Sequence, residues 1–367
     1  MENNKLLQAR AVIDETDKKM AELFCARMKA VRTVAEYKME NGLPVFDPQR
    51  EEQVILKNSE YLEGEDASLR ECYVKFLRET MAVSRHYQTR LLEGMRVAYS
   101  GSEGAFAHIA AGRIFPSAQR VGYSCFPDAY EAVARGECDA VVLPIENSSA
   151  GEVGAVADLL FSGPLYINGT YDLAIIQDLL TLPGADPAKI REVVSHPQAL
   201  SQCAPYIRAH GYTEREFANT ALAAEYVAKL GDPTVAAVAS EEAGAKYGLT
   251  VAARAINENT NNTTRFAVLS AARNRYPGEK GQNIRFIMMF TVRNEAGSLA
   301  RAIEIIGKHG FNMQSLRSRP MKELLWQYYF YVEAEGNIDT EAGEAMMREL
   351  EGCCDQLKLV GSYKHSI

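Results

Sequence analysis

The sequence predicts three regions of different fold class: an all-α helical bundle at residues 1–94, an α/β region at 95–272 and a small α+β region at 282–367. Three observations support this division. In the first region apolar residues recur at helical spacing without a strand pattern. In the second, short apolar runs alternate with helical segments, which is typical of parallel sheets. The third region shows the element order βαββαβ.

The composition is that of a globular protein with a sizeable core. Of the 367 residues, 47% are hydrophobic and 24% are charged, and the length suggests two or three domains. The net charge of −8 argues against a nucleic-acid-binding or polybasic membrane-binding protein. Without a long apolar run or a signal core at the N-terminus, we expect a cytoplasmic protein. The seven cysteines show no Cys-x-x-Cys spacing, so we expect reduced thiols and no zinc site.

The first region is expected to contain three helices. The first runs over residues 6–40 without Gly or Pro, and Asn41-Gly42 ends it. Asp47 is the expected N-cap of a second helix over residues 48–61, and a third follows over 68–92. A helix of about 35 residues spans about 50 Å. Because that is too long for packing within 94 residues alone, we expect the first helix to pair with another chain.

Cations, amides and hydroxyls lie on these helices at spacings that place them on shared faces. Arg27 and Lys38 are three turns apart, whereas Arg10 lies about 25 Å from Arg27 along the axis and would serve the same kind of site only from a partner subunit. Further candidates at i, i+3 and i+4 spacing are Asp47, Arg50, Glu51, Ser84 and Gln88. Taken singly, each is more often a solvated surface residue. Together they suit catalysis by positioning and charge stabilisation.

This set resembles the active site of the all-helical chorismate mutases, over nearly all of residues 5–90. The resemblance implies that the partner subunit's Arg10 and Arg27 hold the two carboxylates of chorismate. Lys38 and Gln88 would then donate to the ether oxygen. Glu51 and the backbone of Asp47 would meet the substrate hydroxyl, and the pocket would be completed by Arg50 and Ser84.

Polar clusters in the second region follow predicted strands and precede predicted helices. They are residues 100–104, 146–151, 195–203 and 219–220. Ligands bind at the carboxyl ends of strands in α/β sheets, and helix N-termini favour anions. The turn at 100–104 lacks the full Gly-x-Gly-x-x-Gly pattern of dinucleotide sites. We therefore expect a cofactor-free site for a dianion, in which His196 is either a general base or a capping residue.

The stretch Asn261–Phe266 places two amides, two hydroxyls and a guanidinium at the end of a predicted strand. A polar turn between two strands is one interpretation. The other polar clusters favour a second interpretation, in which Arg265 fixes an acidic substrate and Thr264 hands over a proton.

The whole second region resembles prephenate dehydratase. The matching motifs are Pro144-Ile145-Glu146-Asn147-Ser148, Ser195-His196-Pro197-Gln198, Gln202-Cys203, Asn219-Thr220 and Thr264-Arg265-Phe266. The resemblance implies two lobes, like the clamshell of periplasmic binding proteins, with the site in the cleft. Thr264 would assist loss of the ring hydroxyl. Prephenate would be bound and oriented by Asn147, Ser148, Ser195, Gln202, Asn219, Thr220 and Arg265. The family usually shows Thr-Phe-Ser where this chain has Ala105-Phe106-Ala107, so other donors must replace those hydroxyls.

The third region follows an expected linker at residues 276–281 and resembles the ferredoxin-like ACT domains that bind phenylalanine. Its two matching motifs are Gly297-Ser298-Leu299, for the usual Gly-Ala-Leu, and Arg317-Ser318-Arg319-Pro320, for the usual Glu-Ser-Arg-Pro. Arg317 reverses a charge in the effector motif. It would weaken binding if it faced the effector's ammonium, but the resemblance favours a place at the subunit contact. A plain interaction module is the alternative.

The three regions together predict a bifunctional enzyme of phenylalanine biosynthesis. It would convert chorismate to prephenate and prephenate to phenylpyruvate, without a cofactor, under feedback by phenylalanine, as a homodimer or larger homo-oligomer. One alternative is a dehydratase that has a vestigial mutase region or prefers arogenate. Another is a non-catalytic amino-acid sensor. The eight-residue helical set argues against the sensor, because a sensor has no use for it.

Overall fold

The computed structural model describes residues 2–259, 261–279, 283–321 and 327–365. The last two residues of the expected linker, Lys280 and Gly281, lie outside this part of the chain. The protein divides into two compact units, Met1–Met95 and Arg96–Ile367. The first boundary agrees with the predicted one at residues 94–95, whereas the expected division between 272 and 282 falls inside the second unit.

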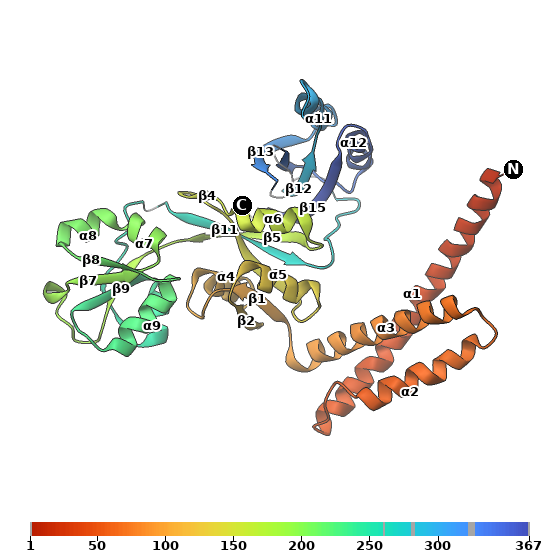
Figure 1. Ribbon diagram of the computed structural model, residues 1–367, viewed down its shortest axis with the longest axis horizontal. Helices are drawn as coiled ribbons and strands as arrows, with labels where there is room; N and C mark the ends of the chain where they lie inside the picture. The colour runs from red at the N-terminus through yellow and green to blue at the C-terminus, as the bar shows by residue number, and fades with distance from the viewer. Residues whose placement is uncertain (1, 260, 280–282, 322–326, 366–367) are drawn as a thin grey trace. The chain divides into compact units, whose positions relative to one another are not determined.

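The first unit consists of helices, as its apolar spacing predicts (Figure 1). The elements are α1 (Glu2–Glu40), α2 (Pro48–Ser59), a short 3₁₀ helix (Glu60–Leu62) and α3 (Ala67–Glu93). Asp47 is the N-cap of α2, since its side chain accepts a hydrogen bond from the Arg50 N–H at 3.0 Å. Both α1 and α2 pack against α3.

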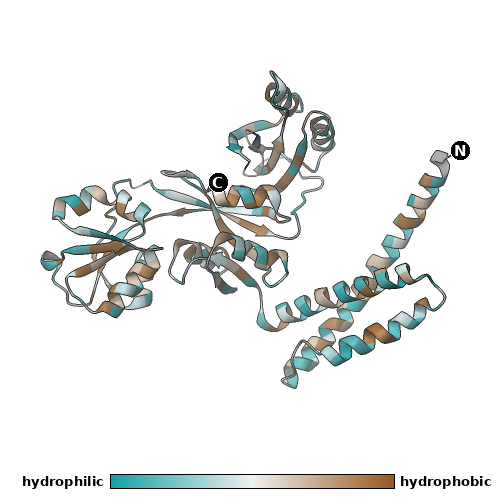
Figure 2. Cartoon of the chain, in the orientation of Figure 1, coloured by the Kyte–Doolittle hydropathy of each residue, from teal (hydrophilic) through white to brown (hydrophobic). Residues whose placement is uncertain are grey.

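The first unit buries few apolar side chains by itself. Among the described residues of this unit, the buried hydrophobic ones are Ala35, Ile55 and Met81. Apolar residues recur along α1 in Figure 2, and many of them are exposed. Those between residues 6 and 24 are Leu6, Leu7, Val12, Ile13, Met20, Leu23 and Phe24. Exposed apolar surface on this scale is typical of a protein–protein interface.

The second unit begins with a lobe built on a large sheet. Its strands are β1 (Arg96–Ser100), β2 (Gln119–Tyr123), β3 (Ala140–Asn147), β4 (Gly151–Glu152), β5 (Tyr166–Ala174) and β11 (Thr263–Ser270). Helices α4 (Phe106–Ile114), α5 (Phe126–Ala134) and α6 (Gly154–Ser162) pack against them. The pairs of β1 with β2 and β3 are parallel, as expected, but β11 runs antiparallel to β3 and β5. The sheet is therefore mixed, because β11 returns from the second lobe.

The second lobe is formed by the chain between β5 and β11 and has its own sheet, in the order β10-β6-β9-β7-β8. The strands are β6 (Asp178–Thr181), β7 (Glu192–Ser195), β8 (Thr213–Glu216), β9 (Val235–Ala239) and β10 (Thr250–Ala253). The helices are a 3₁₀ turn (Pro187–Lys189), α7 (Pro197–Gln202), α8 (Ala204–His210), α9 (Thr220–Leu230) and α10 (Glu241–Tyr247). The chain thus crosses between the lobes twice (Figure 1).

The C-terminal region has the predicted order of strands and helices. They are β12 (Ile284–Thr291), α11 (Ser298–Lys308), β13 (Asn312–Pro320), β14 (Tyr328–Glu335), α12 (Glu341–Glu351) and β15 (Gln356–Lys364). The strands form an antiparallel sheet that continues into the first lobe, because Gly361 of β15 pairs with Ile167 of β5. A Cβ at Gly361 would lie 2.0 Å from the Ile167 carbonyl oxygen, so the approach requires glycine.

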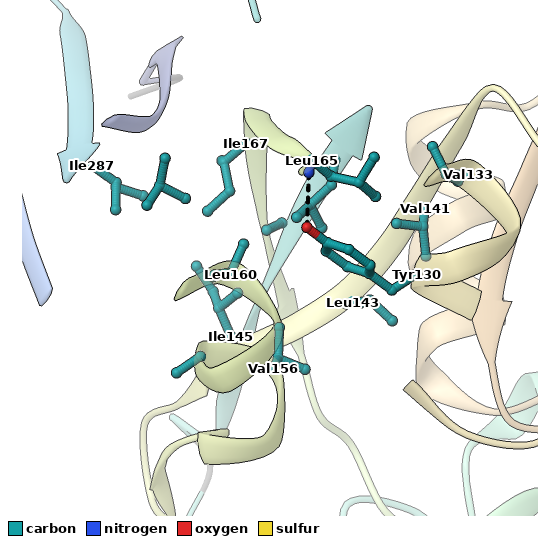
Figure 3. Packing of buried hydrophobic residues seen from close by; sticks show 14 of the residues in the cluster. Tyr130, Val133, Val141, Leu143, Ile145, Val156, Leu160, Leu165, Ile167 and Ile287 are labelled. Atoms are coloured by element: carbon teal, nitrogen blue, oxygen red, sulfur yellow. Dashed lines mark hydrogen bonds between the residues drawn. The ribbon is translucent and has the colours of Figure 1, made fainter. Parts of the chain in front are cut away.

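One hydrophobic core joins the C-terminal region to the first lobe. Figure 3 shows Ile287 of β12 beside Ile167 and Leu165, and Tyr130 of α5 on the other side of Leu165. The buried Tyr130 hydroxyl accepts a hydrogen bond from the Leu165 N–H at 2.8 Å. This shared core explains why residues 96–367 form a single compact unit. No described helix has the length and apolarity needed to span a membrane.

Candidate functional sites

The polar residues predicted on the first unit are partly brought together. Arg27 of α1 donates to the Ser84 hydroxyl of α3, and Gln88 lies one turn further along the same face of α3. Ser84 and Gln88 are buried, and the Gln88 Oε1 atom has no hydrogen-bond partner among the described residues. Burial lowers the pKa of the Arg27 guanidinium, and the Ser84 hydroxyl to which it donates is neutral. A half-buried cation on a neutral partner is well suited to receive an anionic substrate.

The other predicted residues of this unit differ in burial. Lys38 is half-buried, whereas Arg10, Asp47 and Arg50 are exposed. The Lys38 ammonium is half-buried and donates to the Val45 carbonyl at 2.5 Å. Asp47 and Arg50 are exposed at the start of α2. Arg10 is exposed on α1, about 25 Å from Arg27 along the helix, so one site cannot include both from the same chain.

Arg85 is a residue of this unit that sequence reasoning missed. Its guanidinium pairs with the Glu51 carboxylate and lies 5.1 Å from the centre of the Phe46 ring. Glu51 is therefore held by a cation from α3, 34 positions along the chain. Such a pair leaves no periodic signal, because it depends on how α2 packs against α3.

The second unit contains a cleft of about 1040 Å³ lined by residues of both lobes. Five of the predicted residues line it: Asn147, Gln202, Asn219, Thr220 and Thr264. Thr264 is at the start of β11 and Asn147 at the end of β3, where the two strands pair directly. The cleft is also lined by Ala105 and Ala107, at the place where the resemblance leads one to expect hydroxyls.

A chain of amide hydrogen bonds ends on the Thr264 hydroxyl. Asn147 Nδ2 donates to Thr264 Oγ1 at 2.9 Å and to Asn262 Oδ1 at 2.8 Å. Asn262 Nδ2 in turn donates to Gln202 Oε1 at 3.0 Å. Since Thr264 accepts from Asn147, its own proton is available to a group in the cleft. Asn262, only 1% exposed, is thus part of the site; the sequence marks the stretch Asn261–Phe266 but assigns this amide no role of its own.

Ser102 and Asn219 approach each other across the cleft. Ser102 follows β1 in the first lobe, and its hydroxyl donates to Asn219 Oδ1 in the second lobe at 3.2 Å. The same oxygen accepts from the Leu222 N–H at 2.7 Å, which makes Asn219 the N-cap of α9. Ser102 therefore supplies a hydroxyl close to the two alanines of the Ala105–Ala107 segment.

Gln177 is another residue that sequence reasoning missed. It lines the cleft on the crossing between β5 and β6, and its side chain is 2% exposed. Its Oε1 atom has no partner among the described residues. Its backbone N–H, in contrast, donates to Asn257 Oδ1, and its backbone carbonyl accepts from the Ile256 N–H. A buried amide oxygen left unpaired costs about 1–3 kcal/mol, so a hydrogen-bond donor that reached this atom would stabilise the protein.

Three residues predicted to contact the substrate have other partners in the structure. Ser195 is fully buried, and its hydroxyl donates to the Val238 carbonyl at 2.5 Å, so it fastens β7 to β9 and does not line the cleft. Ser148 bonds to the backbone of Asn261 and Thr263 and fastens the loop after β3. In both residues the hydroxyl satisfies a backbone hydrogen-bonding group. This is common, because most side-chain hydrogen bonds in proteins are made to the backbone or to water.

The third residue is Arg265, for which the sequence predicts contact with a substrate carboxylate. Successive side chains of a strand point to opposite faces, so Arg265 points away from the cleft that Thr264 lines. Its guanidinium makes two bonds to Asp172, at 2.9 and 3.2 Å, and lies 3.8 Å from Glu333. The hydrogen bond with Asp172 raises the pKa of Arg265, despite partial burial.

His196 caps a helix, which confirms the capping interpretation. Its Nδ1 atom accepts from the Gln198 N–H at 3.2 Å at the start of α7. The imidazole also lines the cleft.

The predicted effector residues lie at two separate places in the C-terminal region. Gly297 is the N-cap of α11 with φ of 88°, a conformation that favours glycine, and Ser298 and Leu299 follow it. On β13, Ser318 is exposed, whereas Arg317 pairs with Glu146 at 2.7 Å. Arg319 makes two bonds to Asp158 of α6, at 2.8 and 3.2 Å. Arg317 therefore contacts the first lobe of its own chain, which differs from both positions considered from the sequence.

Two family models match the chain: chorismate mutase type II over residues 9–89 and prephenate dehydratase over residues 97–274. The chain is 31% identical to the bifunctional chorismate mutase/prephenate dehydratase of Enterobacter agglomerans, over 98% of this chain and 96% of that protein. A protein of the same name from Aquifex aeolicus is 30% identical over 99% of each. The structure of prephenate dehydratase from Arthrobacter aurescens in complex with L-Phe gives a TM-score of 0.68 at 25% identity, over 74% of this chain and 90% of that one.

Proposed function

The chain belongs to the bifunctional chorismate mutase/prephenate dehydratase family, and we propose that its two activities occupy two separate sites. The helical unit would rearrange chorismate to prephenate, and the cleft of the second unit would convert prephenate to phenylpyruvate. The observation that carries the second assignment is the chain of amides that leaves the Thr264 proton free toward the cleft.

The mutase site would act by positioning and by stabilising charge. Arg27 is a half-buried cation beside a neutral hydroxyl, which suits one carboxylate of chorismate. The partner subunit's Arg10 would hold the other carboxylate. Lys38 and the buried Gln88 amide would donate to the ether oxygen, which gains negative charge as its bond to carbon breaks.

The remaining mutase residues would bind the substrate hydroxyl and close the pocket. Glu51 has a fixed orientation because Arg85 holds its carboxylate. The backbone of Asp47, the Arg50 guanidinium and the Ser84 hydroxyl would complete the pocket. Removing one such charge-stabilising donor commonly lowers kcat about a hundredfold or more.

In the dehydratase site, loss of carbon dioxide and loss of water are joined. The electron pair of the breaking carbon–carboxylate bond would move into the ring and expel the hydroxyl on the opposite ring carbon. That hydroxyl would take the Thr264 proton and leave as water, and the ring becomes aromatic. Asn147 would hold the Thr264 oxygen in place and stabilise the negative charge left on it.

The dianionic substrate would be held by groups from both lobes. Thr220 and the N-terminus of α9 offer donors on one side of the cleft, and the Ser102 hydroxyl on the other side would turn from Asn219 to the substrate. Gln202 is fixed through Asn262, and the unpaired Gln177 amide oxygen would accept a hydrogen bond from the substrate. Closing the lobes on these groups would exclude water from the reaction.

The C-terminal region is proposed as a ferredoxin-like ACT domain, at residues 282–367, that binds phenylalanine. Its order of strands and helices and the positive φ at Gly297 support this assignment. The Arthrobacter aurescens dehydratase, which was solved in complex with L-Phe, gives further support. The start of α11, at Gly297 to Leu299, would receive the effector carboxylate. Calorimetric titration with phenylalanine tests the proposal, and absence of both heat and inhibition at millimolar phenylalanine would refute it.

The exposed apolar residues of α1 support a homodimer or larger homo-oligomer. The few buried apolar side chains of the first unit give little stability to a monomer, and pairing α1 helices would cover the exposed ones. The same pairing would bring the partner subunit's Arg10 to the site of Arg27.

Product analysis with chorismate as the only substrate tests the proposed function. The purified protein is expected to form prephenate first and phenylpyruvate afterwards. Phenylpyruvate from added prephenate but not from chorismate would show a vestigial mutase. Faster turnover of arogenate than of prephenate would show an arogenate dehydratase. If chorismate, prephenate and arogenate are all left unchanged, the remaining alternative is a non-catalytic amino-acid sensor.

A further inference from the structure

The strands that carry Asn147 and Thr264 also carry two charged side chains behind the cleft. Glu146 and Arg265 are paired directly across β3 and β11, one position away from the Asn147–Thr264 pair. Neither of the two charged side chains lines the cleft. Because adjacent side chains of a strand share one backbone, displacing the charged pair also displaces the pair that faces the cleft.

Both charges are held by the C-terminal region. Arg317 of β13 donates to Glu146 at 2.7 Å and lies 5.5 Å from the centre of the Tyr331 ring. Glu333 of β14 lies 3.8 Å from Arg265. The other acidic partner of Arg265 is Asp172 of β5. The two catalytic strands are therefore each tied to the C-terminal region by a charge pair.

In the C-terminal region, the acidic residue Glu333 is held in place by buried hydrogen bonds. Glu333 is 3% exposed and accepts hydrogen bonds from the Tyr363 hydroxyl at 2.6 Å and from Arg285 at 3.2 Å. Glu146, Arg317, Tyr331 and Glu333 line one cavity of about 10 Å³. A space of that size holds roughly one water molecule at most, so solvent cannot replace a missing partner freely.

We propose that Arg317 and Glu333 are positioning residues of the dehydratase. Acting through Glu146 and Arg265, they fix the ends of β3 and β11, and with them the distance between Asn147 and Thr264. The inference rests on the proposed dehydratase function of the cleft. It extends that function, because it gives the C-terminal region a part in catalysis that needs no effector.

Steady-state kinetics with prephenate test this inference. Arg317→Met and Glu333→Gln remove one partner from each pair. We expect kcat to fall about tenfold to a hundredfold, because small displacements of reacting groups have effects of that size. KM should change much less, because neither side chain meets the substrate. Arg317→Lys keeps the charge and should recover most of the rate.

Arg273→Met is the matched control. It breaks an ion pair that is more buried than Arg317–Glu146, with Asp339 of the C-terminal region at 2.5 Å, but it contacts neither Glu146 nor Arg265. This variant should lose thermal stability and keep its kcat. Mutase activity should be unchanged in every variant, because it belongs to the other compact unit.

A double-mutant cycle of Glu146→Gln and Arg317→Met gives the decisive comparison. If Arg317 acts through Glu146, the double variant will be about as slow as the slower single variant. Multiplied losses, unchanged kcat in folded Arg317→Met, or an equal loss in Arg273→Met would overturn the inference. Should Glu333→Gln fail to fold, the more exposed Arg317 still provides the test. An inactive wild-type dehydratase would instead overturn the proposed function.

Discussion

The side-chain amide of Asn147 is fixed from both sides. Its oxygen accepts from the backbone N–H groups of Ser149 and Ala150, at 3.0 and 2.9 Å. Its nitrogen must therefore face Asn262 and Thr264, which settles which atom donates. A threonine that accepts from an amide can give its proton to a leaving hydroxyl, whereas one that donates to a neighbouring oxygen cannot.

Asn147→Asp tests this orientation with almost no change of shape. The aspartate offers only acceptors, so the Thr264 proton would turn toward it and away from the substrate. We expect dehydratase kcat to fall about a hundredfold while mutase activity is retained. Stopped or steady-state assays with prephenate measure the loss, and a variant with near wild-type kcat would show that Thr264 is not the proton donor.

His108 predicts how stability depends on pH. Its Nδ1 atom accepts from the Gly104 N–H at 3.2 Å, which fixes the turn that carries Ser102. Burial, followed by the charge of Arg120, lowers the pKa of His108 below its usual 6.5. A histidine whose pKa is lower in the folded state contributes stability that is fully present above pH 6.5, the pKa of the unfolded state. This stability is lost as the pH falls through the folded-state pKa.

We therefore expect the free energy of unfolding to decrease between pH 7 and pH 5 more in the wild type than in His108→Asn. Asparagine can accept the same hydrogen bond and does not titrate. Urea unfolding of both proteins at several pH values measures the difference. Parallel pH profiles would show that His108 does not titrate on unfolding in this range.

At the scale of elements, the pairing of β15 with β5 depends on Gly361. Gly361→Ala would place a methyl group 2.0 Å from the Ile167 carbonyl oxygen, so the two strands must move apart. We expect a loss of about 1–3 kcal/mol in the free energy of unfolding of the second unit, typical of overpacking. Gly169→Ala on β5 is the control, because its Cβ would meet Val268 at an ordinary 3.9 Å. Equal stability of the two variants would contradict the strand contact.

The elements that the sequence predicts best are those with local signals. Asp47 and His196 cap the helices that follow them because a cap bonds to its own backbone two or three residues on. The strand–helix alternation likewise places polar clusters at the cleft. The antiparallel direction of β11 was not predicted, since it depends on the second crossing between the lobes.

The site residues that the sequence missed or misplaced depend on tertiary packing. Arg85 reaches Glu51 and Ser102 reaches Asn219 only because distant elements meet. Ser195 looked available to substrate, but it bonds to a carbonyl of the neighbouring strand. Arg265 carried a usable signal: it neighbours Thr264 on one strand, and period-two alternation forbids both from facing the same cleft.

At the scale of the whole molecule, the mutase site is expected to need two chains. Arg10→Ala and Arg27→Ala should each abolish mutase activity, because each removes a cation that binds a carboxylate. Mixed and refolded together, the two variants should regain part of the activity, since one site of each heterodimer would contain both arginines. Verified heterodimers without mutase activity would contradict a site shared between subunits.

One chain is expected to contain two independent sites, and product analysis of paired variants tests this most directly. Chorismate is supplied to wild type, Arg27→Ala and Thr264→Ala, and prephenate and phenylpyruvate are quantified over time. We predict that Thr264→Ala accumulates prephenate, and that Arg27→Ala leaves chorismate unconsumed yet converts added prephenate at nearly the wild-type rate. Loss of both activities in either folded variant would contradict the account.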